Sequence, residues 1–116
     1  MDNLFFADES VSGYEFVPES ANVDFCLKIK GTSMINARIY DGDIVFIRKQ
    51  SDVDNGEIAV VLIDSNEAKL KRVYKVNGNV ILRPENPEFP DQVYSRKEFK
   101  SVRIIGKAIF FQSGVR

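Results

Sequence analysis

Two Asn-Gly pairs, Asn55-Gly56 and Asn77-Gly78, constrain the fold of this chain more than any other feature. Asparagine and glycine both accept the positive φ angles that tight turns between antiparallel strands require. A short polar connection over residues 64–67 lies between the two pairs. The segments that flank these three turn signals are apolar and rich in β-branched residues. The pattern predicts a meander of antiparallel hairpins in the middle of the chain.

The first predicted strand, residues 24–30, alternates between two faces. Phe25, Leu27 and Ile29 share the apolar face, which is typical of a strand that buries one side. Cys26 falls on the other, more polar face, and we expect it to be partly buried there.

The remaining segments also favour β structure. We expect a short helical turn within 34–40, a tight turn at Asp41-Gly42-Asp43, and a bend at Gly106 in the last strand. Three prolines within 84–91 exclude regular strand pairing and predict a loop there. Further strands are predicted over residues 44–48, 57–63, 68–76, 80–83 and 101–112. The sequence therefore predicts a mostly β protein.

Composition limits the kinds of function. The 116 residues form one domain, and a formal net charge of -1 excludes a strongly basic nucleic-acid surface. Histidine is absent and Cys26 is the one cysteine, so we expect no internal disulfide, no zinc site and no cofactor. The turn at Asp41-Gly42-Asp43 lacks the further ligands of a calcium loop. No apolar run approaches the roughly 20 residues that span a bilayer, which predicts a cytoplasmic protein without a membrane anchor.

The absence of histidine also limits how a serine could be activated. Gly31-Thr32-Ser33-Met34 places Ser33 directly after a predicted strand, at a turn that glycine begins. Such a turn exposes the hydroxyl and directs the backbone N–H groups of Thr32, Ser33 and Met34 toward one point, where they could stabilise an oxyanion. Without imidazole, the simplest base is a buried neutral amine, and Lys71 lies in a later predicted strand.

Lys71 has two opposed interpretations. By alternation it shares a face with Lys69 and Val73, while Leu70 faces the other way. Burial on that face would lower the pKa of the amine by several units from about 10.4 and make it a useful base. A lysine on a strand is more commonly a solvated charge, and a serine after glycine is more commonly a plain turn residue. Neither Ser33 nor Lys71, taken alone, decides between the catalytic and the structural interpretation.

The ordered set of motifs is more specific than any one of them. The motifs are Gly31 to Met34, Asp41 to Val45, Asn55 to Val60, Leu70 to Tyr74, Leu82 to Pro87 and Ile104 to Lys107. Together they resemble the C-terminal self-cleaving domain of LexA-like repressors, the serine–lysine peptidase family that includes lambda-type phage repressors and UmuD. The resemblance covers residues 22–111.

The resemblance implies a compact single domain of curved antiparallel sheets, with Ser33 as nucleophile and Lys71, rather than Lys69, as general base. It implies a homodimer that uses Ile104 to Gln112. It also implies cleavage of the protein's own linker at an Ala-Gly or Cys-Gly bond, stimulated by RecA filaments after DNA damage. DNA would be bound through a separate N-terminal helix-turn-helix domain.

Two departures from the family pattern concern the N-terminal end. Residues 1–21 cannot hold a helix-turn-helix domain, and Ser12-Gly13 is the nearest match to a cleavage site. We expect residues 1–21 to be a lead-in from the linker and cleavage region, and 22–116 to be the peptidase and dimerisation domain of a fragment without its own cleavage site. Two alternatives stay open: a dimerisation module with a vestigial dyad, and a UmuD-like polymerase accessory.

Overall fold

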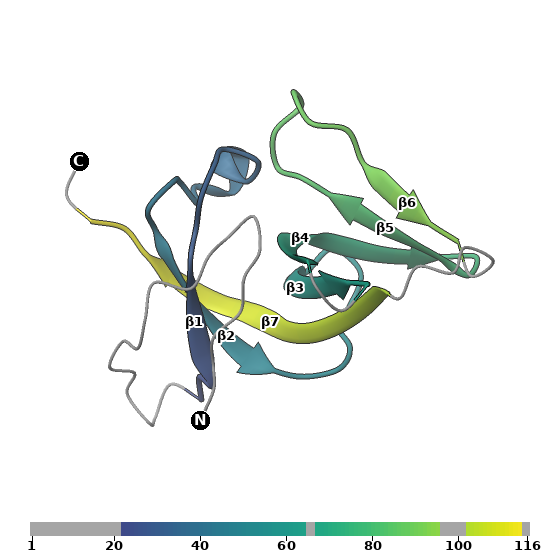
Figure 1. The fold of residues 1–116 in the computed structure, drawn as a ribbon, viewed down its shortest axis with the longest axis horizontal. Coiled ribbons are helices and arrows are strands. Elements are labelled where there is room, and N and C mark those ends of the chain that lie inside the picture. The colour runs from purple at the N-terminus through teal and green to yellow at the C-terminus, as the bar shows by residue number, and fades with distance from the viewer. Residues whose placement is uncertain (1–21, 65–66, 96–101, 115–116) are drawn as a thin grey trace.

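The computed structural model describes residues 22–64, 67–95 and 102–114 (Figure 1). These residues form one seven-stranded antiparallel sheet with the strand order β1-β2-β7-β3-β4-β5-β6, and one short 3-10 helix. The mostly β, single-domain prediction is therefore confirmed, whereas the predicted lead-in 1–21 lies outside the described residues. The elements are β1 (Phe25–Lys28), η2 (Ile35–Ala37), β2 (Ile44–Lys49), β3 (Ile58–Ile63), β4 (Glu67–Val76), β5 (Asn79–Arg83), β6 (Gln92–Tyr94) and β7 (Val102–Gln112).

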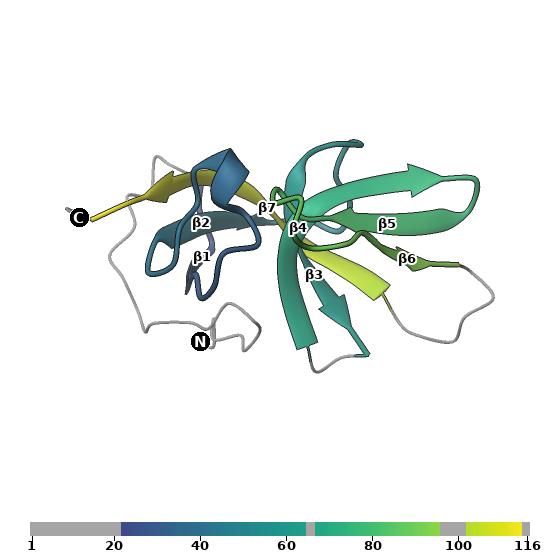
Figure 2. The same ribbon diagram turned by 90° about the horizontal axis from the view of Figure 1, so that it is seen from above.

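The last strand, β7, joins the two halves of the sheet. It pairs with β2 along one edge and with β3 along the other, and Figures 1 and 2 show it passing from the β1–β2 half to the β3–β4 half. The register shifts twice, between Phe46 and Ile47 on β2 and between Val60 and Val61 on β3. Such irregularities bend a strand and increase its twist, which curves the sheet. Gly106 lies between the two shifts, where the bend was predicted.

The position of β7 corrects part of the predicted meander. β3, β4, β5 and β6 do follow one another as neighbouring strands, and Asn77 and Gly78 both have positive φ, as a tight hairpin turn requires. Asn55-Gly56, by contrast, does not close a hairpin between β2 and β3, because β7 lies between those strands. A turn signal in the sequence cannot indicate that a C-terminal strand such as β7 will lie between the two strands that flank the turn.

Cys26 is more deeply buried than the alternation of β1 predicted. It is 5% exposed and lies opposite Phe46 of β2, which is also buried. The Phe46 ring stacks on Phe110 of β7 with centroids 4.6 Å apart. This face of β1 therefore continues into an aromatic surface supplied by distant strands, and the prediction of a partly buried, polar face was wrong.

Two hydrophobic clusters lie on opposite faces of β3 and β4. The first cluster contains Val60 and Leu70, and the second contains Ala59 and Val73. Since residues opposite each other in a ladder share a face, the pairing of Lys71 with Ala59 places Lys71 on the face of the second cluster. The strand alternation predicted for β4 therefore agrees with the packing.

An ion pair fastens β7 to the turn before β3. Lys107 Nζ lies 2.6 Å from Glu57 Oε2, and the N–H of Asp54 donates to Glu57 Oε1 over 2.8 Å. The bond from Lys107, with a smaller contribution from Asp54, holds the pKa of Glu57 below its usual 4.5. A carboxylate whose pKa is lower in the folded than in the unfolded state stabilises the fold at any pH above its unfolded pKa. This stabilisation is lost as the pH falls through the pKa of the folded state.

We therefore expect Glu57→Gln to flatten the acid side of the stability curve. The melting temperature of the parent chain should fall further than that of Glu57→Gln between about pH 7 and about pH 3, because glutamine has no charge to lose. Thermal unfolding at both pH values measures the difference. An equal fall in the two proteins would contradict a stabilising role for this pair.

Candidate active site

Ser33 lies in a tight turn between β1 and η2. Gly31 begins the turn with a φ of 101°, in the left-handed region that favours glycine. Its N–H donates to Asp41 Oδ1 over 2.7 Å and so ties the turn to residues 41–43. The next side chain after the serine, Met34, is 2% exposed and packs in the first hydrophobic cluster. The turn therefore holds Ser33 between an anchored glycine and a buried side chain.

Lys71 reaches this serine from β4. Its Nζ lies 3.0 Å from Ser33 Oγ, within hydrogen-bond distance, and 3.1 Å from the carbonyl oxygen of Leu70. Lys71 is 6% exposed, and its strand partner Ala59 is fully buried. Removal of an amine from water disfavours its charged form, so this burial favours an amine that can accept a proton. The structure thus brings together the two side chains that the sequence singled out.

The three N–H groups predicted as oxyanion donors are unused within the part of the chain that the structure describes. There, the N–H groups of Thr32, Ser33 and Met34 donate no hydrogen bond. Backbone donors beside a nucleophile can stabilise negative charge on an attacked carbonyl oxygen. The turn therefore offers free donors next to the Ser33 hydroxyl.

A cavity of about 200 Å³ opens beside the two side chains. It is lined by Ser33, Lys69 and Lys71, by Pro84, Phe89 and Pro90 of the connection between β5 and β6, and by Gln92 of β6. This volume is below the roughly 300 to 1,000 Å³ of typical small-molecule sites.

Lys69 has a different environment from Lys71, although both line this cavity. Its Nζ pairs with Glu67 Oε2 at 3.3 Å, and its side chain is 15% exposed. No bond from Lys69 to Ser33 is present among the described residues. The geometry therefore favours Lys71 over Lys69 as the partner of Ser33.

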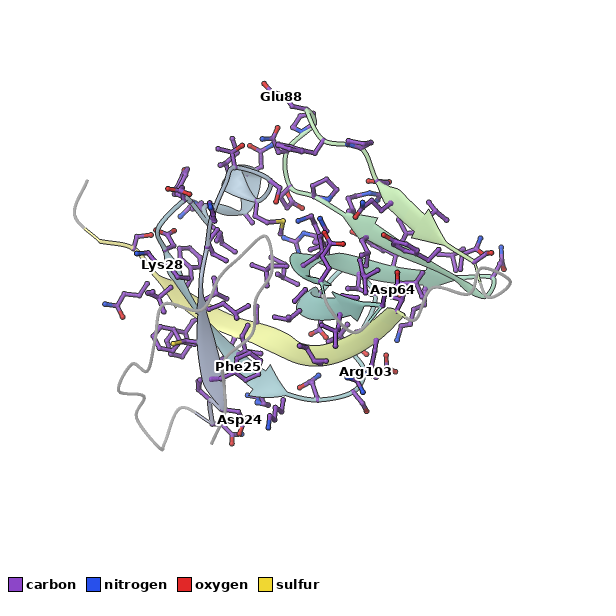
Figure 3. The ribbon with its side chains drawn as sticks, viewed as in Figure 1. Asp24, Phe25, Lys28, Asp64, Glu88 and Arg103 are labelled. Atoms are coloured by element: carbon purple, nitrogen blue, oxygen red, sulfur yellow. The ribbon has the colours of Figure 1, made fainter. Side chains whose placement is uncertain are left out.

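The connection between β5 and β6 also holds the serine turn in place. Its tip, marked by Glu88, rises on the same side of the sheet as η2 (Figures 1 and 3). The N–H of Glu85 donates to the Ser33 carbonyl over 2.8 Å, and Asn86 Nδ2 donates to the Thr32 carbonyl over 2.9 Å. The sequence predicted a loop here and gave no role to Glu85 or Asn86, because no local pattern predicts hydrogen bonds between segments so far apart.

The acidic turn at 41–43 has structural partners. Asp41 binds the N–H of Gly31, and buried Asp43 accepts hydrogen bonds from the N–H of Tyr40 and the hydroxyl of Ser113, over 2.8 and 2.9 Å. Among residues 22–64, 67–95 and 102–114, no three His, Cys, Asp or Glu side chains gather as a metal site requires. The same described segments contain no helix that is long and apolar enough to cross a bilayer.

The C-terminal half of β7 carries two exposed aromatic side chains, one on each face of the strand. Phe110 is 42% exposed and Phe111 is 37% exposed. Both line a hollow of about 290 Å³ together with Ile39 and Val45. These residues fall within the segment from Ile104 to Gln112 that was predicted to take part in a dimer.

Comparison with known proteins gives consistent matches. A family model described as "Peptidase S24-like" matches residues 4–109. The chain is 47% identical over 85 residues to a LexA repressor of Exiguobacterium sp. (strain ATCC BAA-1283 / AT1b), covering 73% of this chain and 39% of that protein. It is 42% identical over 107 residues to a LexA repressor of Bacillus mycoides (strain KBAB4), covering 89% of this chain and 50% of that protein. The chain thus spans half or less of the length of these relatives.

Proposed function

Because the chain belongs to the peptidase S24-like family, we propose that it is a serine peptidase domain with Ser33 as nucleophile and Lys71 as general base. The observation that carries this proposal is the 3.0 Å contact between Lys71 Nζ and Ser33 Oγ, made by a lysine that is 6% exposed. A serine hydroxyl is a weak nucleophile until a base removes its proton. The position and the burial of Lys71 support its assignment as that base.

The first half of the proposed reaction forms an acyl-enzyme. The neutral amine of Lys71 takes the proton of the Ser33 hydroxyl while Oγ attacks the carbonyl carbon of a peptide bond. Negative charge develops on the carbonyl oxygen, and the N–H groups of Ser33 and Met34 stabilise it. The ammonium of Lys71 then returns its proton to the leaving amine as the peptide C–N bond breaks.

The second half releases the acyl group. Water enters the cavity beside Ser33 and Lys71 once the amine product has left. Lys71 removes a proton from this water as the water attacks the ester carbonyl. The Lys71 ammonium then gives the proton to Ser33 Oγ as the C–O bond breaks, which restores the hydroxyl and the neutral amine. Each step uses the same base in the same place, so one buried amine is sufficient for both halves.

The relatives are LexA repressors, which supports a role in transcriptional repression. In this proposal the domain cleaves the linker that joins it to an N-terminal DNA-binding domain, in the cytoplasm and in response to a RecA filament. Two linked DNA-binding domains bind an operator more tightly than separate ones, because the second binding event is intramolecular. Cleavage of the linker would therefore lower operator affinity.

The exposed aromatic side chains of β7 support the homodimer in this proposal. Phe110 and Phe111 present apolar area beside a hollow, and a two-fold axis would bring this surface against its own copy. The two rings lie on opposite faces of the strand, so self-association through one face would cover one of them. The same strand would then carry the sheet pairing within one protomer and the contact between two.

Self-cleavage of a fusion protein tests the proposed function. A linker with one Ala-Gly bond is placed before residue 1, and fragment formation is followed by electrophoresis. We expect cleavage that becomes faster as the pH rises, because the reactive form of Lys71 is the unprotonated amine. Ser33→Ala should leave the fusion intact at every pH, since it removes the attacking oxygen.

The same fusion distinguishes the alternative of a vestigial dyad. Dimers in sedimentation combined with no cleavage at any pH would contradict the peptidase proposal and leave the dimerisation module. Cleavage of the Ser33→Ala fusion at the parent rate would show that another group is the nucleophile.

A further inference from the structure

Three hydrogen bonds join the serine turn to the connection after β5. The N–H of Glu85 donates to the Ser33 carbonyl, Asn86 Nδ2 donates to the Thr32 carbonyl, and the N–H of Asn36 donates to the Glu85 carbonyl. Their lengths are 2.8, 2.9 and 2.8 Å. Two adjacent residues after β5 therefore hold two adjacent carbonyl groups of the turn that bears Ser33.

The held carbonyls belong to the peptide groups that carry the free donors. The Thr32 carbonyl shares a planar peptide group with the N–H of Ser33, and the Ser33 carbonyl shares one with the N–H of Met34. In a planar trans peptide the C=O and the N–H point in opposite directions, and the structure contains no cis peptide bond among the residues it describes. Fixing the carbonyl ends therefore fixes the direction of both N–H groups.

The connection is itself anchored to the strand that bears the lysine. Arg72 follows Lys71 directly on β4, and its Nε donates to Glu85 Oε2 over 2.5 Å. Its Nη1 also donates to the Gly56 carbonyl over 2.6 Å, which braces the guanidinium from a second side. A partly buried, charge-assisted bond of this kind is stronger than a bond between neutral groups. One strand thus holds Lys71 directly and the serine turn through Arg72 and Glu85.

The side chain of Asn86 is buried, and both ends of its amide are hydrogen-bonded. It is 7% exposed. Besides the bond from its Nδ2 to Thr32, its Oδ1 accepts the N–H of Glu88 over 3.0 Å. The two ends of the amide therefore have different partners, and the donor end serves the serine turn alone among the described residues.

We propose that Glu85 and Asn86 act as positioning residues that aim the N–H groups of Ser33 and Met34 at the oxyanion. This inference rests on the proposed function, because it requires Ser33 to be the nucleophile. It assigns to the connection after β5 a role in stabilising the transition state, separate from the proton transfer that Lys71 performs. Neither residue touches the reacting atoms.

A fluorophosphonate probe tests this role with the chain itself. Ser33 Oγ attacks the phosphorus, the P–F bond breaks, fluoride leaves, and the hydroxyl proton passes to Lys71. The probe's P=O oxygen occupies the place of the oxyanion. The kinetics of labelling, followed by intact-mass spectrometry, separate the affinity for the probe (KI) from the rate of the chemical step (kinact).

Asn86→Asp is the sharpest variant, because it keeps the shape and the acceptor for Glu88 but replaces the donor to Thr32 with an anionic oxygen. We expect kinact to fall about ten- to a hundredfold, below the effect of about 10² to 10³ for complete loss of an oxyanion donor. KI should change less than about twofold and the pH profile should keep its shape, because Lys71 is not altered. Asn77→Asp adds the same charge at an exposed residue of the turn between β4 and β5, where an Asp-Gly pair is also accepted, and should label at the parent rate.

Asn86→Ala is a second variant that keeps the test decisive if Asn86→Asp does not fold. It removes both side-chain bonds and should show a similar fall in kinact, with a melting temperature that demonstrates a folded protein. Parent-like kinact in either folded Asn86 variant would overturn the positioning role while leaving the peptidase proposal intact. Absence of labelling in the parent chain would instead overturn the proposed function on which this inference rests.

Discussion

Replacing Lys71 with methionine is expected to abolish self-cleavage of the linker fusion while leaving the fold at least as stable. Methionine fills a similar volume but has no group that can take the proton of Ser33. Loss of a general base lowers a rate by typically about 10² to 10⁴. The buried amine is also costly to desolvate, so an apolar replacement at a position that is 6% exposed should hold or raise the melting temperature. Activity and stability would then change in opposite directions.

Lys75→Met is the matched control for this variant. Lys75 lies on the same strand, and alternation puts it on the same face, but it is exposed and bonds to Asp52 and to the Val53 carbonyl. Its loss should cost little stability, since exposed ion pairs are screened by solvent and contribute little, and should leave cleavage unchanged. If Lys71→Met cleaved at the rate of the Lys75→Met fusion, Lys71 would not be the base.

Gly106→Ala is expected to cause the largest loss of stability from the addition of a single methyl group. A Cβ on Gly106 would lie 2.4 Å from Ile47 Cγ2 and 2.9 Å from the carbonyl oxygen of Arg48. Ile47 is fully buried and β-branched, and the carbonyl belongs to the backbone, so neither can move aside easily. Overpacking of this kind costs about 1 to 3 kcal/mol, and we expect the upper end because β7 must shift against β2.

Gly114→Ala provides the comparison for Gly106→Ala. Gly114 is exposed, and a Cβ there would meet nothing within 4 Å. Its substitution should change the free energy of unfolding by less than about 0.5 kcal/mol. Urea unfolding of both variants measures the difference. Equal stability of the two alanine variants would contradict the close approach of β7 and β2 at residue 106.

The sequence predicted most of the strands because their signals are local. Alternation and turn residues predicted the strands of the β3–β5 region. Because the chain has no histidine, a lysine was the simplest base for Ser33, and Lys71 was the candidate. Their proximity was an inference from chemistry and family resemblance, and the structure places their side-chain atoms 3.0 Å apart. The burial of Lys71 depends on a ladder partner, Ala59, and could not be deduced from the alternation of β4 alone.

The features that the sequence did not predict depend on contacts between distant segments. Buried Cys26 lies opposite Phe46 of β2, whose ring stacks on Phe110 of β7. β7 also separates β2 from β3, which the local pattern joins in one meander. Asn86 lies in a loop and bonds to a carbonyl 54 positions earlier in the chain. Spacing rules for helices, strands and turns describe neighbours in sequence and contain no information about such a bond.

Identification of the residue that reacts with a fluorophosphonate tests the central claim most directly. The parent chain and Lys71→Met are treated with the probe at near-neutral pH, digested, and mapped by mass spectrometry. An activated hydroxyl beside a buried amine predicts phosphonylation at Ser33 in the parent chain and none in Lys71→Met. An unlabelled parent chain, or equal labelling of Ser33 in both proteins, would contradict the activation of Ser33 by Lys71.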